Sequence, residues 1–133
     1  MSAVVPAFLR VSIDAPAEVR VGEPVPITLR LENVGDRPLD LYLRGRTIAF
    51  DVVVTREDGS VVWQRLEGEI IPAIIQQVPI GAGETLELGT EWSQRTAAGL
   101  PVEPGRYFVQ AMLPTDERDP LTSQPIRLDI VTD

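Results

Sequence analysis

The chain contains no cysteine, no histidine and no lysine. Without cysteine it can form no disulfide bond and offers no thiolate nucleophile. Without histidine it lacks the imidazole base of a Ser-His-Asp triad and the commonest nitrogen ligand of zinc. Without lysine it cannot form a Schiff base with a substrate. There is also no glycine-rich loop of either common phosphate-binding type, so we expect no cofactor.

Carboxylates, hydroxyls and arginines are the groups that remain for catalysis. A glycosidase uses two carboxylates, and the pair of a retaining enzyme lies about 5 Å apart. Glu87 and Glu91 share one face of a predicted strand, where four residues at a rise of ~3.3 Å place them ~13 Å apart. That separation is too large for a retaining pair. We therefore predict that the chain is not an enzyme.

The charge balance argues against a nucleic-acid partner, because 12 arginines face 20 acidic residues and the net charge is −8. Binding to phosphates requires clustered cations. No apolar run approaches the ~18 residues that a membrane-spanning helix needs, and no signal-peptide pattern is visible. We expect one domain over residues 1–133, without membrane insertion and located in the cytoplasm.

Short alternating apolar runs, separated by proline, glycine, asparagine and aspartate, fill the chain. This pattern predicts an all-β sandwich or barrel. The twelve prolines would disrupt helices but are tolerated at strand starts, sheet edges and turns. The predicted strands lie at 9–13, 25–33, 39–43, 47–55, 61–66, 84–92, 105–113 and 125–131.

Two local signals refine the fold. Asp58-Gly59 supplies the positive φ that a tight hairpin turn needs. Tyr107 precedes Val109 by two residues, the spacing at which a tyrosine ties the E–F corner of an immunoglobulin-like domain through its hydroxyl group. We predict an immunoglobulin-like antiparallel β-sandwich of about seven to nine strands, closed by packing because no disulfide is available.

One apolar segment does not fit the alternation. Residues 66–84 contain Ile70, Ile71, Ile74 and Ile75 almost without interruption. In a sandwich this segment must cross from one sheet to the other, and it could be buried on more than one face. Alternatively, it is a partly exposed apolar surface that binds a partner. The residues alone leave both interpretations open.

A second segment, 114–121, is rich in acids. Asp116, Glu117 and Asp119 could recruit calcium, but the loop lacks the spacing and the glycine of an EF-hand. A solvated turn is the simpler interpretation, and we predict no metal site.

The motifs between Phe50 and Tyr107 resemble those of the intracellular proteinase inhibitor (BsuPI) family of bacterial immunoglobulin-like domains. They are Phe50-Asp51-Val52-Val53-Val54, Asp58-Gly59, Val62-Trp63, Ala82-Gly83-Glu84-Thr85-Leu86, Trp92 and Pro104-Gly105-Arg106-Tyr107. The chain departs from the family pattern at 66–74, where aliphatic residues replace polar and aromatic ones.

The resemblance implies a protein that binds and inhibits subtilisin-type serine proteases. The candidate contact residues lie in two loops: Ile70, Ile71, Pro72 and Ile74 in one, and Asp116, Glu117, Arg118 and Asp119 in the other. A different function also remains open, that of a non-inhibitory binding or assembly module of the cell envelope or cytoplasm, because this fold hosts many functions. Arginine and proline on predicted edge strands indicate a monomer.

Overall fold

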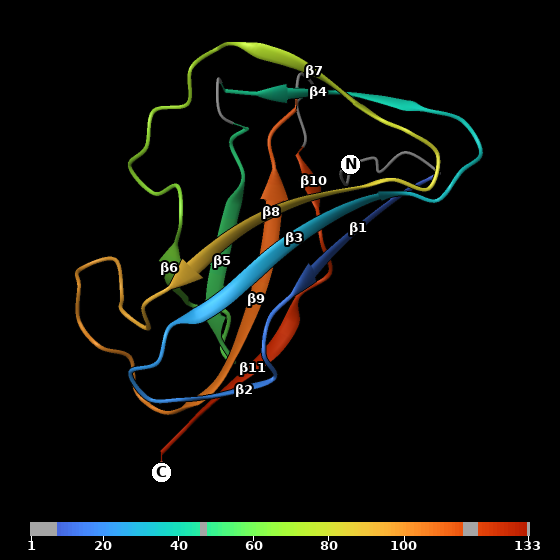
Figure 1. Cartoon of the computed structure of the whole chain (residues 1–133). Coiled ribbons are helices and arrows are strands. Elements are labelled where there is room, and N and C mark those ends of the chain that lie inside the picture. The colour runs from blue at the N-terminus through green and yellow to red at the C-terminus, as the bar shows by residue number, and fades with distance from the viewer. Residues whose placement is uncertain (1–7, 46–47, 116–119, 133) are drawn as a thin grey trace.

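The computed structural model describes residues 8–45, 48–115 and 120–132 (Figure 1). These residues form eleven β-strands, and no helix is found among them. The strands are β1 (Leu9–Asp14), β2 (Glu18–Arg20), β3 (Val25–Asn33), β4 (Leu39–Arg44), β5 (Asp51–Arg56), β6 (Val61–Gln64), β7 (Ile75–Ile80), β8 (Thr85–Trp92), β9 (Gly105–Leu113), β10 (Leu121–Thr122) and β11 (Ile126–Val131). Accordingly, the described part of the chain has no helix long and apolar enough to span a bilayer.

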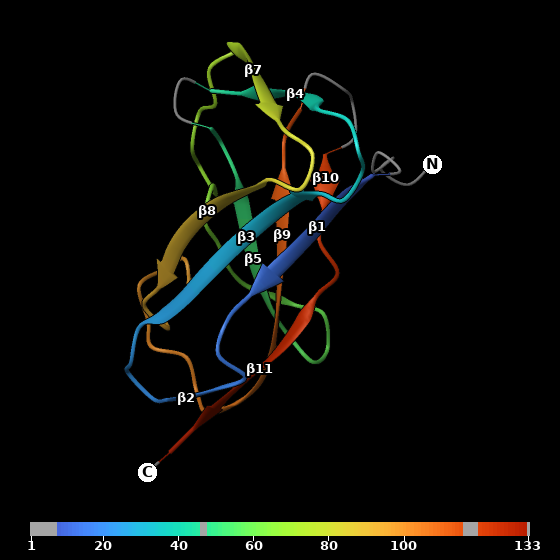
Figure 2. The ribbon, with the colours of Figure 1, turned by 45° about the vertical axis from the view of Figure 1, so that its right-hand side comes forward.

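The strands form two layers with a smaller sheet at one end. One layer has the order β1-β3-β8, and the other has the order β2-β11-β9-β5-β6, with β10 beside β9. Figures 1 and 2 show the first layer crossing over the second, with the pair β4-β7 at one end. All pairs are antiparallel except β2 with β11. The predicted immunoglobulin-like sandwich is confirmed, with β7 and the short strands β2 and β10 added to those expected.

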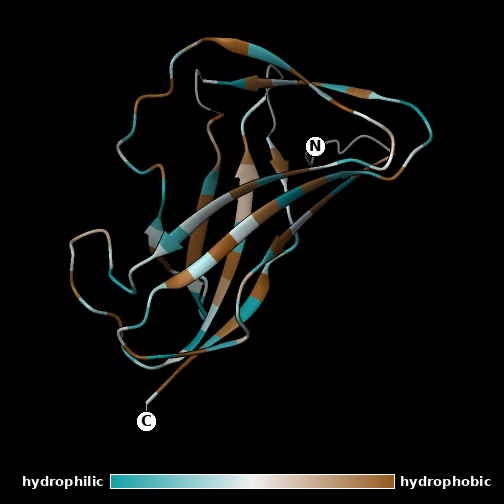
Figure 3. Cartoon of the chain, viewed as in Figure 1, coloured by the Kyte–Doolittle hydropathy of each residue, from teal (hydrophilic) through white to brown (hydrophobic). Residues whose placement is uncertain are grey.

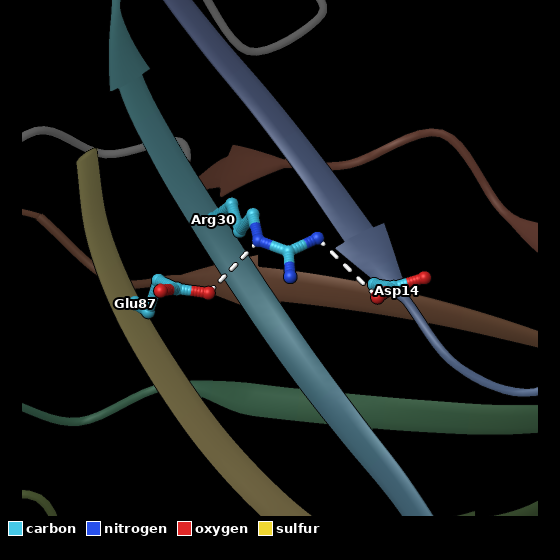
Figure 4. A network of polar contacts seen from close by, with 3 residues as sticks. All are labelled: Asp14, Arg30 and Glu87. Atoms are coloured by element: carbon cyan, nitrogen blue, oxygen red, sulfur yellow. Dashed lines mark hydrogen bonds and ion pairs between the residues drawn. The ribbon is translucent and has the colours of Figure 1, made fainter. Parts of the chain in front are cut away.

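The core lies between the layers and follows the predicted alternation. In β3 the side chains of Val25, Ile27, Leu29 and Leu31 are at most 1% exposed. The intervening residues face outward, and Figure 3 shows the resulting change between brown and teal along this strand. On this outer face Arg30 donates from Nε to Glu87 at 2.8 Å and from Nη1 to Asp14 at 3.3 Å (Figure 4).

Three aromatic rings connect the layers. Trp92 of β8 is fully buried; its ring stacks against Trp63 at 6.2 Å and meets the edge of Tyr107 at 6.0 Å. The hydroxyl of Tyr107 donates to the backbone oxygen of Glu103 at 2.6 Å, which confirms the predicted tyrosine corner. Burial raises the pKa of the Tyr107 phenol, because a low-dielectric surrounding disfavours the phenolate.

The predicted hairpin turn joins β5 to β6. Gly59 has a φ of 88°, a conformation that side chains rarely adopt. The hydroxyl and the backbone amide of Ser60 both donate to the Asp58 carboxylate, at 2.6 and 2.9 Å. These bonds favour the ionised form and lower the pKa of Asp58. The turn thus fixes the end of the sheet that lies away from the apolar segment.

Candidate protein-contact site

The apolar segment lies largely in solvent. We call residues 70–75 the apolar ridge. Ile70 is 93% exposed, Ile75 43% and Ile74 37%. Pro72 and Ala73 are exposed as well, and Ile71 is half-buried. The interpretation of this segment as a buried seam of the core is therefore wrong, and the alternative of an exposed apolar surface describes it.

The reason for this exposure is the route of the chain. β6 ends at Gln64, and the chain runs past the edge of the six-stranded sheet to reach β7 beside β4 (Figure 1). A segment at a sheet edge is covered on one side at most, so its apolar side chains remain in water. Contiguous exposed apolar side chains are uncommon in monomeric proteins and mark interaction surfaces.

The near end of the ridge is anchored by Asp51. Its carboxylate is buried, with 7% of the residue exposed. It accepts hydrogen bonds from the amides of Val52 and Leu66, at 2.9 and 3.0 Å, and from Nε2 of Gln64 at 2.5 Å. The sequence predicted the strand that contains Asp51, but it did not reveal that Gln64 and Leu66 would donate to that carboxylate.

Arg65 adds a second anchor at the same end. Its Nη1 donates to the backbone oxygen of Phe50 at 2.6 Å, and its guanidinium lies 3.9 Å from the centre of the Phe50 ring. The backbone then turns, because the amide of Glu69 donates to the oxygen of Leu66 at 3.0 Å and Gly68 has a φ of 76°. The ridge therefore starts from a fixed base.

The far end of the ridge is held by the loop after β4. The amide of Gly45 donates to the oxygen of Ile74 at 2.9 Å, and the side-chain amide of Gln76 donates to the oxygen of Gly45 at 2.5 Å. Among the described residues, no backbone hydrogen bond uses an amide or carbonyl of residues 70–73. The middle of the ridge thus offers its peptide groups to solvent or to a partner.

A hollow of about 280 Å³ lies beside the ridge. Its lining residues are Gly45, Ile48, Ala49, Arg65, Leu66, Glu69, Ile70, Ile71 and Pro72. Its lining is mainly apolar, and an apolar cavity of about 150 Å³ already accommodates a benzene ring. The exposed side chain of Ile70 therefore lies beside a hollow that could receive an apolar side chain from a partner.

A larger hollow of about 680 Å³ lies near the β5–β6 turn and the start of β9. Charged side chains of both signs line it, including Arg56, Glu57, Asp58 and Arg106. Such a lining is well hydrated, and a partner that covers it gains little binding free energy, because removing charges from water is costly. None of the described residues predicted to contact a partner, Ile70, Ile71, Pro72 and Ile74, lines it. Size alone therefore does not make it the better candidate.

The second predicted contact loop, Asp116, Glu117, Arg118 and Asp119, lies outside the described residues. That these residues contact a partner stays a prediction. Within the described ranges, no group of three acidic side chains gathers in a way that could hold a metal ion.

A family model matches most of the chain. The family model described as "BsuPI: Intracellular proteinase inhibitor" matches residues 13–118. This match includes the ridge and confirms the resemblance carried by the motifs between Phe50 and Tyr107. None of the curated proteins compared with the chain matches it.

Several solved structures resemble this chain at low sequence identity. An alkylpurine DNA glycosylase, AlkC, from Pseudomonas fluorescens, bound to DNA with an abasic site analogue, is 16% identical, with a TM-score of 0.50 over 93% of this chain and 30% of that chain. The CARDB domain of a Pyrococcus furiosus protein, in complex with di-metal ions, is 17% identical, with a TM-score of 0.48 over 98% and 95% of the two chains. A β-glucosidase from Erythrobacter marinus is 18% identical, with a TM-score of 0.49 over 92% and 16%. The chain thus spans less than a third of either enzyme, and these similarities concern the fold alone.

Proposed function

Because this chain belongs to the intracellular proteinase inhibitor (BsuPI) family, we propose that it inhibits serine proteases of the subtilisin type and that the apolar ridge contacts them. Membership in a family of inhibitors agrees with the prediction that the chain is not an enzyme and supports a protein, a protease, as its partner. The family description also supports a place in the cytoplasm. A monomer of one domain is the simplest form in which the protein would act.

The observation that carries the proposal is the exposure of Ile70. Burying an isoleucine side chain gains about 1.5–3 kcal/mol. Ile70 is 93% exposed, and Ile74 and Ile75 are exposed by 37% and 43%, so covering all three would contribute about 2.5–5 kcal/mol before the cost of association. Subtilisin-type clefts favour apolar side chains, and the ridge carries no charge.

Two modes of binding are open to the ridge. Residues 70–73, whose peptide groups make no described backbone bond, could lie in the cleft like a substrate. In that mode Pro72 would protect the bond between Ile71 and Pro72 from hydrolysis. Alternatively, the ridge could pack beside the cleft and block its entrance.

The test is a titration of a subtilisin-type protease with the purified domain, with a trypsin-type enzyme as a comparison. We expect stoichiometric loss of subtilisin-type activity while the domain stays uncleaved. Ile70→Glu should weaken inhibition by at least about 30-fold, since a charge would enter an apolar contact.

The matched control is Leu100→Glu. Leu100 is also an exposed aliphatic residue, at 63%, but it lies in the loop after β8, beside the charged hollow. Both variants should fold as the wild type does, because neither side chain is buried. If a large molar excess inhibits none of several subtilisin-type proteases, the proposal is wrong, and the protein is a binding module of another kind.

A further inference from the structure

The edge strand β7 presents a defined set of backbone groups to solvent. β7 pairs antiparallel with β4, and among the described residues no strand pairs with its other edge. In an antiparallel pair, residues alternate between those that bond to the partner strand and those whose amide and carbonyl point away from it. Which residues of β7 point outward can be worked out from two observations.

The first observation is Pro79, which stands opposite Asp40. Proline has no amide hydrogen, so within a paired strand it suits a position that points away from the neighbour. The second is the bond from the amide of Gly45 to the oxygen of Ile74, which continues the same register. Both place the even-numbered residues toward β4. The amides and carbonyls of Ile75 and Gln77 therefore point to the free edge.

This free edge lacks the protection that other edges of the protein carry. Natural edge strands discourage pairing with foreign strands by means of charged side chains and prolines. Edge strand β8 carries Glu87 and Glu91, both exposed. Residues 70–80 carry no charge at all, and Pro72 and Pro79 limit the unprotected stretch. An edge of this kind is a liability unless a partner uses it.

We propose that an extended segment at the rim of the protease cleft adds to the sheet along residues 73–77, bonding to the outward backbone groups of Ile75 and Gln77. This inference rests on the proposed function and specifies how the partner is held. This stretch overlaps the ridge at residues 73–75, so one partner covers both. Backbone bonds supply affinity in such strand addition, and neighbouring side chains supply specificity.

A second copy of the chain fits this edge less well. If the β7 strands of two copies paired antiparallel with Gln76 at the centre, Pro79 of each copy would stand opposite Ala73 of the other. Proline has no amide hydrogen, so a backbone hydrogen bond would be missing at each of these two positions. Ile70 would then extend past the end of the other copy's strand, and the most exposed apolar side chain would stay in water. A protease that pairs with the edge can also cover the ridge, including Ile70.

The experiment compares two proline substitutions at outward-pointing amides. Gln77→Pro removes an outward donor of β7 and leaves the bonds to β4 intact. The control is Glu91→Pro, because Glu91 of β8 stands opposite Pro26 of β3 and by the same rule points its amide outward. We expect Gln77→Pro to raise the inhibition constant about tenfold or more and Glu91→Pro to change it less than about twofold. Both should melt near the wild-type temperature.

Amide hydrogen exchange of the wild type makes the test independent of whether a variant folds. In the free protein, Ile75 and Gln77 should exchange faster than Gln76 and Val78, and in the protease complex they should become protected. Equal inhibition by Gln77→Pro and the wild type, or no protection of these amides in the complex, overturns strand addition while the inhibitory function stands. A wild type that inhibits no protease overturns both. Self-association that Gln77→Pro abolishes would assign the edge to a second copy instead.

Discussion

Replacing Asp51 by alanine should loosen the base of the apolar ridge and destabilise the fold. Its buried carboxylate accepts bonds from Val52, Leu66 and Gln64. A hydrogen bond to a charged group contributes about 1.5–3 kcal/mol. Gln64 is only half-buried and can turn to water, so we expect a net loss of about 3 kcal/mol. For a domain of this size that loss lowers the melting temperature by roughly 10 °C.

Asp51→Asn is the matched control for this prediction. Asparagine keeps an oxygen for the amides of Val52 and Leu66, and the Gln64 amide can rotate to accept from the new NH₂ group. We expect it to cost no more than about 1 kcal/mol. Urea unfolding followed by circular dichroism gives both values, provided that the slope m is unchanged.

The same pair of variants connects the anchor to function. With Asp51→Ala the ridge and its base should be cut by the target protease within residues 66–75, whereas the wild type and Asp51→Asn should stay intact. Peptide mass mapping after incubation locates the cuts. The reasoning is refuted if Asp51→Ala is as stable as the wild type to within about 0.5 kcal/mol, a change typical of surface substitutions that break no buried contact.

Tyr107→Phe should lower the free energy of unfolding by about 1–2 kcal/mol, because it removes the buried hydroxyl that donates to Glu103. The pKa of Tyr107 is raised in the folded protein, so its contribution to the free energy of unfolding is complete below pH ~10 and is lost as the pH rises through the folded-state pKa. Urea midpoints from pH 8 to 11 should therefore fall more steeply for the wild type than for the variant. Equal slopes for the two proteins would contradict this. Arg30→Gln should leave the melting temperature within about 2 °C of the wild type, because the bonds to Asp14 and Glu87 join exposed side chains; a larger drop that disappears in high salt would show that this network matters more than its exposure indicates.

Much of the sandwich could be predicted from the sequence because one face of each long strand meets the core. The alternation of Val25, Ile27, Leu29 and Leu31 identifies their shared side without any knowledge of the partner strand. The tyrosine corner was also predictable, because its donor and acceptor lie four residues apart in the chain. Features set by such local spacing are visible in a single sequence.

Features that depend on distant segments were not visible. Gln94 is buried, has a φ of 60°, and bonds to the backbone of Arg20, Gly22 and Glu23, more than seventy residues earlier. Nothing near Gln94 in the sequence indicates those partners. β7 was missed for a related reason. Its inner residues Gln76 and Val78 are only half-buried, so the contrast between its two faces is weak.

The exposure of the ridge is another feature that depends on distant segments of the chain. A run such as Ile70-Ile71-Pro72 has no period from which a buried face could be recognised. Whether this run is covered depends on the path of the chain between β6 and β7. That path is set by how the sheets are arranged and not by the residues of the run. The sequence could therefore pose the two alternatives, and the fold was needed to choose between them.

The stacked pair Trp63 and Trp92 gives the protein a built-in optical reporter. These are its two tryptophans, with ring centres 6.2 Å apart, one fully buried and the other half-buried near the end of β6. Indole fluorescence shifts with the polarity of its surroundings, and Trp63 stands two residues before Arg65, where the ridge is anchored. At this separation the two rings share their excitation, so the emission belongs to the pair. It should change when the ridge is covered, through Trp63, and it should change again when the sheets separate and the rings part. Binding and unfolding could thus both be followed without attaching a dye.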